Sequence, residues 1–442
     1  MLYRLHTNIF LVGLLSIGIL AALVPARSGC VMTAGTVLAF ITQVALLLYF
    51  CQQAGRQYSG RNLLGTVLAY GFLMAAVFMA ISYYYEGDTF MFSKSDARLY
   101  YTNSMKSAEL GFWDNAARLI RKHEFDDWGA LLFDSLLMAI IPSKLFLNAV
   151  YIVSGAVSSV LLFRLGRRVM PDAFAFCSAL AYGTSSFLIF FHCTFLKESI
   201  FVFLVICAMY FFYEAVGGGG PWAYIWTALF LGLIVFFRPA VSAMLVIAFL
   251  AHFAVSQRGT ALSVFLYLIM GALLVFSLST IQDMVDTYTG GDVDAMIEYG
   301  TVGGYSSSFS LFVSSFAAPF GPFPSLFPKV PGEPLTINFY GAGLTYKLFL
   351  TVPMWLGVFY AIKHRDAHMI PLITYILVGM VATAYVMASL ELRKVMTHIP
   401  FTYTLAFYGL YRWDTAEKPL LREPVFHLFA VGVLALWNVI RG

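Results

Sequence analysis

The chain has 442 residues, of which 60% are hydrophobic, 17% aromatic and only 11% charged, and its formal net charge is +4. Soluble domains carry about 25% charged residues, so this composition excludes a soluble protein, and the mean hydropathy of +0.80 agrees with that conclusion. The basic residues lie in short loops, which indicates membrane topology and excludes a nucleic-acid-binding surface.

Apolar runs long enough to cross about 30 Å of hydrocarbon recur along the whole chain. Lipid offers the backbone no hydrogen-bond partner, and the runs lack the period-two alternation of barrel strands, so each must be a helix. The sequence predicts an all-α polytopic membrane protein with about 13 transmembrane helices in a single transmembrane domain over 1–442. The spans are expected at 8–25, 31–51, 63–84, 145–164, 172–194, 199–216, 221–237, 239–257, 261–279, 346–363, 368–389, 396–412 and 423–440.

Short loops on one side of the membrane carry the basic residues, which predicts the orientation. With a cytoplasmic N-terminus, the loops on the inner face all contain cations, as the positive-inside rule requires: Arg56, Arg61, Arg164, Arg167, Arg168, Arg258, Lys363, Arg365, Arg412, Lys418 and Arg422. This pattern holds only if 129–143 does not cross, so that segment is expected to be a re-entrant or interfacial helix. A bacterial inner (plasma) membrane is the expected location.

Two long segments, 85–144 and 280–345, then lie on the outer side and contain most of the acidic residues. Ordered loops of this length are usually functional. The first is predicted to form two short amphipathic juxtamembrane helices, at about 94–110 and 112–125, that rest on the membrane surface. Most acids of this segment, Asp127 among them, are expected on a solvated helix face.

Ionisable residues at the outer ends of spans are the candidates for chemistry, because the sequence contains no P-loop, dinucleotide fingerprint or HExxH motif. Charges at membrane depth are costly and usually face a pocket; here they are Asp96, Lys197, Glu198, Arg238, Glu391, Arg393 and Lys394. Anchoring in lipid headgroups is the alternative role for each cation. Arg and Lys can hold a phosphate, and a carboxylate opposite can deprotonate a hydroxyl, which suits sugar transfer from a polyprenyl phosphate.

Three stretches resemble the GT-C superfamily of membrane glycosyltransferases, nearest to the aminoarabinose-transferase and protein O-mannosyltransferase type. Residues 95–100 (SDARLY) resemble the first outer loop of that family, where an acidic pair precedes a tyrosine. Residues 163–168 (FRLGRR) resemble the basic turn that closes a span, and 391–400 resemble a late outer arginine followed by a span that starts with proline. The resemblance is best over 96–215 and elsewhere concerns only the layout of the spans.

The resemblance implies an inverting glycosyltransferase that moves a sugar from a polyprenyl-phosphate-linked donor to a lipid, glycan or protein acceptor on the extracytoplasmic face. Polysaccharide or glycolipid biosynthesis in the cell envelope is the expected context. Asp96 matches the aspartate proposed as general base in the family. The expected substrate-binding residues, with the cations facing the donor phosphate, are Tyr100, Lys197, Glu198, Arg238, Arg393 and Lys394. Ala97 replaces the usual second acid, so a metal site there is in doubt; no cofactor is required, and a divalent cation is left open.

Two other functions stay open at this point. An O-antigen-type polymerase or ligase of lipid-linked oligosaccharides would share the many spans, but 280–345 contains only Lys329 and no arginine for such a reaction. A transporter or flippase of lipid-linked sugars would be expected to show internal repeats and charges near the midplane, and neither is evident here. In every case the expected partners are membrane lipids and lipid-linked sugars, with no nucleic acid.

Overall fold

The computed structural model describes residues 30–52, 58–90, 96–123, 125–256, 350–351, 353–382 and 395–415. All regular structure within these residues is helical, without strands, which confirms the predicted all-α class. The expected spans at 8–25, 261–279 and 423–440, and the second long segment at 280–345, lie outside the described residues. The total of about 13 spans therefore stays a prediction.

Four described helices are long and apolar enough to cross a membrane: α3 (Gly60–Glu86), α8 (Lys144–Gly166), α11 (Glu198–Val216) and α13 (Pro239–Ser256). Helices α9 (Asp172–Gly183) and α10 (Ser186–Thr194) are long and apolar enough only when taken together, and they meet at a bend of 45°, as in a broken span or a re-entrant segment. This bend divides the continuous helix expected over 172–194. Shorter or less apolar helices complete the bundle: α2 (Cys30–Gln52), α12 (Pro221–Val235), α18 (Ile370–Val381) and α20 (Ile399–Thr415).

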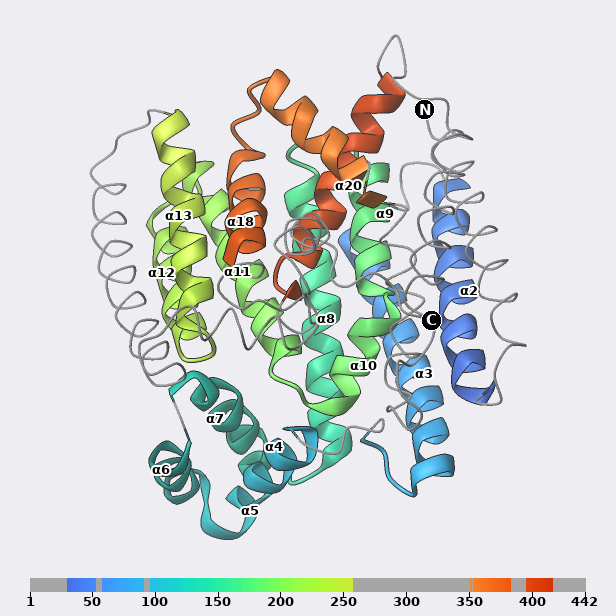
Figure 1. Cartoon of the computed structure of the whole chain (residues 1–442), viewed down its shortest axis with the longest axis vertical. Coiled ribbons are helices and arrows are strands. Elements are labelled where there is room, and N and C mark those ends of the chain that lie inside the picture. Colours follow the sequence, from blue (N-terminus) through green and yellow to red (C-terminus); the bar gives the residue numbers. More distant parts are fainter. Residues whose placement is uncertain are drawn as a thin grey trace, which may run out of the picture.

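Helix α8 lies in the middle of the bundle, where it contacts α3, α9 and α11 (Figure 1). Helix α11 also packs along α12, while α13 packs on α18 and α20 packs on α9. In its apolar window, 78% of α11 is buried but only 33% of α3. Helix α11 is therefore an interior helix, whereas α3 presents much of its surface outward, where an apolar helix in a membrane meets lipid.

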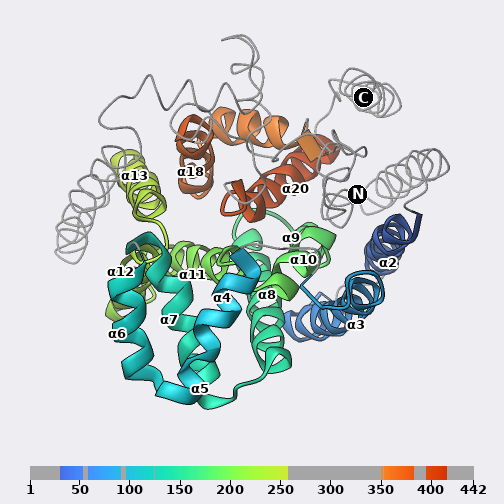
Figure 2. The same cartoon turned by 60° about the horizontal axis from the view of Figure 1, so that its bottom comes forward.

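Four helices form a layer at one end of the bundle, below α8, α11 and α12 in Figure 1 and facing the viewer in Figure 2. They are α4 (Asp96–Met105), α5 (Ser107–Leu110), α6 (Phe112–Lys122) and α7 (Phe125–Ile140). The helix expected over 94–110 is divided at Lys106, and α6 corresponds to the one expected over 112–125. Helix α7 includes most of the segment, 129–143, that the charge pattern predicts not to cross the membrane, and it lies in this layer rather than along the bundle.

Contacts with α8 and with the turn after α12 help to fix α7 to the bundle. The buried Asp134 accepts a hydrogen bond of 2.8 Å from the Tyr151 hydroxyl on α8. The N–H of Gly129 donates to the Phe236 carbonyl at 2.9 Å, and a Cβ atom at position 129 would lie 2.4 Å from the Phe237 ring. Only glycine allows so close an approach, so α7 and the turn after α12 are held together directly beside Arg238.

Candidate functional site

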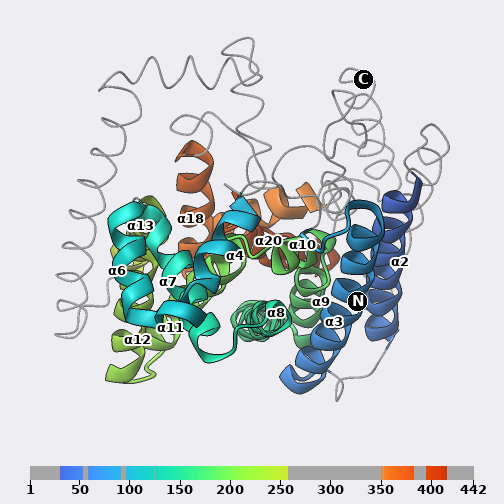
Figure 3. The same cartoon turned by 90° about the horizontal axis from the view of Figure 1, so that it is seen from below.

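The α4–α7 layer lies across the end of the bundle where α11 and α13 begin (Figure 3). A group of polar side chains gathers at this junction. We call it the polar cluster. Helix α4 supplies two members, α7 supplies one, the start of α11 supplies two and the turn before α13 supplies one: Asp96, Tyr100, Asp127, Lys197, Glu198 and Arg238. Segments far apart in the sequence thus contribute to one place at the end of the bundle.

A tight reversal between α10 and α11 positions Lys197 and Glu198. Helix α10 ends at Thr194, and the next residue, Phe195, adopts the left-handed conformation with φ of 53°. Its fully buried ring stacks on Tyr101 at 5.9 Å and packs against Tyr151 at 6.3 Å. Lys197 is the N-cap residue of α11 and Glu198 is its first residue. The Lys197 side chain reaches Asp127 in the layer, and that of Glu198 faces Arg238.

Asp127 connects α4, α7 and α11. Its Oδ1 atom accepts a hydrogen bond from Lys197 Nζ at 2.6 Å and another from the Tyr100 hydroxyl at 3.0 Å. The Lys197 side chain is only 9% exposed and that of Asp127 33%. Burial opposes ionisation of Asp127, but the Lys197 ammonium and the Tyr100 hydroxyl outweigh it and hold the pKa of this carboxyl below its usual range. Asp127 is therefore a stable carboxylate partner for a buried cation.

Tyr100 stays protonated in this setting. Burial raises the pKa of its hydroxyl well above the usual value, and the nearby charges of Asp127, Glu198 and Asp96 raise it further. Asp96 is the first residue of α4, one helical turn before Tyr100, and its side chain is half-buried. The Tyr100 hydroxyl is consequently a fixed hydrogen-bond donor between acidic groups.

Glu198 and Arg238 form a second, looser pair. The Glu198 side chain is 2% exposed and that of Arg238 19%, and Arg238 Nη2 lies 3.5 Å from Glu198 Oε1. Glu198 Oε2 is buried and has no hydrogen-bond partner among the described residues. The Phe237 ring stacks on Phe201 at 5.7 Å and directs the turn that precedes Pro239, the first residue of α13. Arg238 has five N–H donors, so one long contact leaves it able to bind an anion.

The structure brings together Asp96, Tyr100, Lys197, Glu198 and Arg238, which are the described members of the predicted site. Arg393 and Lys394 lie outside the described residues, so their place relative to the cluster stays a prediction. Asp127 was missed, because it was expected on a solvated helix face. The available signal was its position in an acidic pair, 126–127, directly before the apolar stretch of α7.

Within the part of the chain that the structure describes, no group of three or more His, Cys, Asp or Glu side chains is placed to hold a metal ion. The carboxylates of Asp127 and Glu198 face the cations Lys197 and Arg238. Such cation–carboxylate pairs can exchange partners when a phosphate arrives, since a phosphate offers the cations equally strong acceptors. A divalent cation stays an open prediction.

Comparison with known proteins relates part of the chain to a described family. Residues 127–281 match the family model described as dolichyl-phosphate-mannose-protein mannosyltransferase. The matched segment covers less than half of the chain; it begins at Asp127 and includes Lys197, Glu198 and Arg238, while Asp96 and Tyr100 precede it. No curated protein matches the chain.

Proposed function

We propose that this chain, which carries a GT-C-type membrane glycosyltransferase domain over residues 127–281, is an inverting enzyme that uses a polyprenyl-phosphate-linked sugar. It transfers that sugar to a lipid, glycan or protein acceptor on the extracytoplasmic face of the membrane. The observation that carries the proposal is the polar cluster, where two cations and three carboxylates gather at a membrane end of the bundle. A lipid-linked phosphate is anionic and lies at this depth.

In the proposed site, Arg238 binds the donor phosphate. Its distance of 3.5 Å from Glu198 is long for an ion pair with good hydrogen bonding, so exchange of Glu198 for a phosphate gains shorter, bidentate bonds. Lys197 is already engaged with Asp127 at 2.6 Å. It contributes positive charge next to the phosphate, and that charge stabilises the leaving group as the bond to the sugar breaks.

Asp96 acts as the general base in the proposed reaction. The acceptor hydroxyl oxygen attacks the anomeric carbon, the bond from that carbon to the phosphate oxygen breaks, and the acceptor proton passes to the Asp96 carboxylate. A single displacement of this kind inverts the anomeric configuration. Asp127 is less suited to this role, because Lys197 and Tyr100 lower its proton affinity. Positioning of donor and acceptor supplies much of the remaining rate.

The placement of basic residues supports a polar cluster on the extracytoplasmic face of the membrane. The polar cluster lies at the α4–α7 end of the bundle, whereas Arg164 and Arg167 lie at the far end of α8, a helix of 23 residues. At about 1.5 Å per residue, α8 separates the two ends by about 34 Å, close to the thickness of a bilayer core. The positive-inside rule assigns the end with Arg164 and Arg167 to the cytoplasm and the polar cluster to the opposite side.

The test is glycosyl transfer by the full chain in liposomes that contain polyprenyl-phosphate-linked sugars, mannose among them, with mass spectrometry of the products. We expect a product that depends on donor. Asp96→Asn should abolish transfer, and Arg238→Ala should raise the KM for donor more than that for acceptor. Arg98→Ala is the matched control, because Arg98 is exposed in the same layer and pairs with Asp88.

Two outcomes contradict the proposal. Transfer at the normal rate by both Asp96→Asn and Arg238→Ala would exclude the polar cluster as the site. Movement of the lipid-linked sugar between leaflets without glycosyl transfer would identify a flippase instead.

A further inference from the structure

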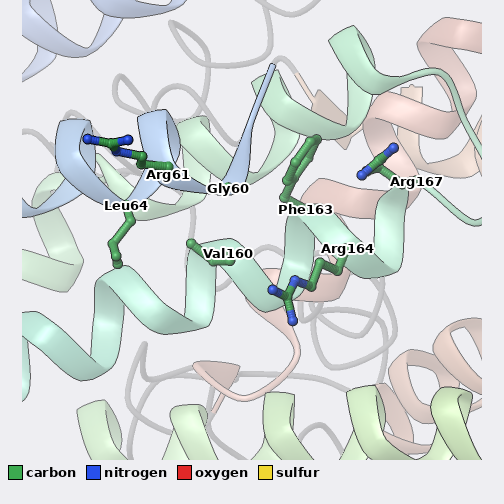
Figure 4. Close-up of a pocket in the computed structure, with 7 residues that line it drawn as sticks. All are labelled: Gly60, Arg61, Leu64, Val160, Phe163, Arg164 and Arg167. Carbon is green, nitrogen blue, oxygen red and sulfur yellow. The ribbon is translucent and has the colours of Figure 1, made fainter. Parts of the chain in front are cut away.

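A second site lies at the other end of the bundle, between the start of α3 and the end of α8. It is a pocket of about 390 Å³ that three arginines and four uncharged residues line: Gly60, Arg61, Leu64, Val160, Phe163, Arg164 and Arg167 (Figure 4). We call it the basic pocket. It shares no residue with the polar cluster, and the reaction proposed above does not use it.

The arginines of the basic pocket carry more positive charge than their neighbours compensate. Arg167 pairs with Asp172 at 2.9 Å, but both side chains are about half exposed, at 51% and 47%. Arg164 donates only a long hydrogen bond of 3.4 Å to the Tyr210 hydroxyl, and Arg61 is exposed without an ion pair to any described residue. Two guanidinium groups at one pocket thus lack an acidic partner within the described part of the chain, and they favour an anionic ligand.

Apolar stripes continue from the pocket along both helices. Residues spaced by three or four, seven and eleven positions share one helix face. From Arg61 this face of α3 carries Leu64, Leu68 and Phe72, and from Arg164 the corresponding face of α8 carries Val160, Val157 and Val153; none of these six apolar side chains is buried. Phe72 is 47% and Val153 43% exposed. Each stripe extends about 16 Å from its arginine, toward the middle of the membrane.

We propose that the basic pocket binds the phosphate headgroup of an anionic membrane lipid, whose acyl chains cover the two apolar stripes. Figure 4 shows Arg61 on α3, Arg164 on α8 and Arg167 directly after α8, with their guanidinium groups well apart rather than directed at one point. That arrangement suits a headgroup with several oxygen atoms. A free phosphate would satisfy the arginines but would leave the stripes uncovered, which is why the lipid is the favoured source of the phosphate chemistry.

The test measures lipid binding to the purified full chain by native mass spectrometry. The probes are phosphatidylglycerol, phosphatidylcholine with the same acyl chains, and inorganic phosphate. We expect tighter binding of phosphatidylglycerol than of phosphatidylcholine. Arg61→Gln/Arg164→Gln should weaken phosphatidylglycerol binding by at least about tenfold, since each arginine loses a charge-assisted hydrogen bond. It should weaken phosphatidylcholine binding less, because the choline cation of that lipid already compensates its phosphate.

Two controls separate this site from general attraction between cations and anionic lipid. Lys106→Gln/Arg121→Gln removes the same charge from exposed positions in the α4–α7 layer, and Lys363→Gln removes an exposed cation outside the pocket. Both should bind phosphatidylglycerol like the unmodified chain. Arg61→Gln alone, at an exposed residue, provides a variant that folds if the double variant does not, and it should weaken binding in the same direction.

Equal weakening in the pocket variant and in the charge-matched control would overturn the proposal, because the effect would then be one of net charge. Unchanged phosphatidylglycerol binding in the pocket variants would also overturn it. Displacement of the lipid by inorganic phosphate at equal concentration would show that the pocket takes a free anion. Because none of these measurements uses transfer activity, failure here is distinguishable from failure of the proposed function.

Discussion

The pair formed by Asp127 and Lys197 allows a test that separates stability from substrate binding. Asp127→Asn removes the carboxylate that lies 2.6 Å from the Lys197 ammonium, while the side chain keeps its shape. Loss of one partner of a fully buried ion pair costs about 3–5 kcal/mol. Water reaches the 33% exposed Asp127 side chain and screens the remaining charge, so we expect a smaller destabilisation, of about 2 kcal/mol.

A double-mutant cycle in detergent solution measures this coupling. The cycle consists of Asp127→Asn, Lys197→Met and the variant with both changes, with unfolding followed by intrinsic fluorescence. The double variant should recover most of the stability that either single variant loses, because it leaves no unpaired charge. Tyr100→Phe is a useful control, since it removes only the 3.0 Å hydrogen bond to Asp127 and should cost about 1 kcal/mol.

Donor binding in the same variants then separates the two roles of Lys197. If Lys197 provides charge next to the donor phosphate, the stable double variant keeps a raised KM for donor. The reasoning would be refuted if the losses of the two single variants summed to the loss of the double variant within about 0.5 kcal/mol. Such additivity would show that the two side chains do not interact. A double variant with both a normal KM for donor and a normal kcat would show that Lys197 has a structural role alone, because a charge that stabilises the leaving group acts on kcat.

Three further predictions concern the layer and its orientation. Burial raises the pKa of Asp134 to about 8, so the folded state holds a proton that the unfolded state releases above its own pKa near 4. The contribution of Asp134 to stability is therefore complete below about pH 4, declines as the pH rises toward 8 and is absent above it. Asp134→Asn should remove this decline from a pH series of thermal unfolding, so that the difference between the two proteins grows between about pH 4 and 8. Gly129→Ala places a methyl group 2.4 Å from the Phe237 ring, so it should lower the free energy of unfolding by about 1–3 kcal/mol and reduce transfer activity. An unchanged melting temperature would show that the structure accommodates the methyl group without loss of stability. Single cysteines should be labelled by a membrane-impermeant reagent from outside at position 96 and only after permeabilisation at position 168, and the reverse pattern would overturn the assigned topology.

The long helices could be predicted from the sequence because, in lipid, an apolar run without strand alternation can satisfy its backbone hydrogen bonds only as a helix. Helices α3, α8, α11 and α13 accordingly begin and end within a few residues of the expected spans. The break between α9 and α10 was not predicted. The apolar run is interrupted at 183–186 by Gly-Thr-Ser-Ser, the place where the helix bends by 45°. That short interruption was the available signal, and it was passed over because the apolar sequence on both sides suggested one continuous span.

The candidate site could be predicted only in part. Lys197, Glu198 and Arg238 were found because a charge amid apolar sequence is costly and has to face something polar. Their partners could not be read from the chain. Asp127 lies 70 positions from Lys197 and 27 from Tyr100, and nothing in the local sequence states that α4, α7 and α11 meet.

The left-handed backbone conformation of Phe195 limits which amino acids can replace it. A residue with a Cβ atom costs about 1–2 kcal/mol in this conformation, and glycine would avoid that cost. Glycine would also empty the space between the rings of Tyr101 and Tyr151 that the Phe195 side chain fills. The backbone conformation at this position therefore favours glycine, whereas the packing favours a large ring. In a library of all substitutions at position 195, few variants should keep the stability of the protein, although none of them alters a reacting group of the polar cluster.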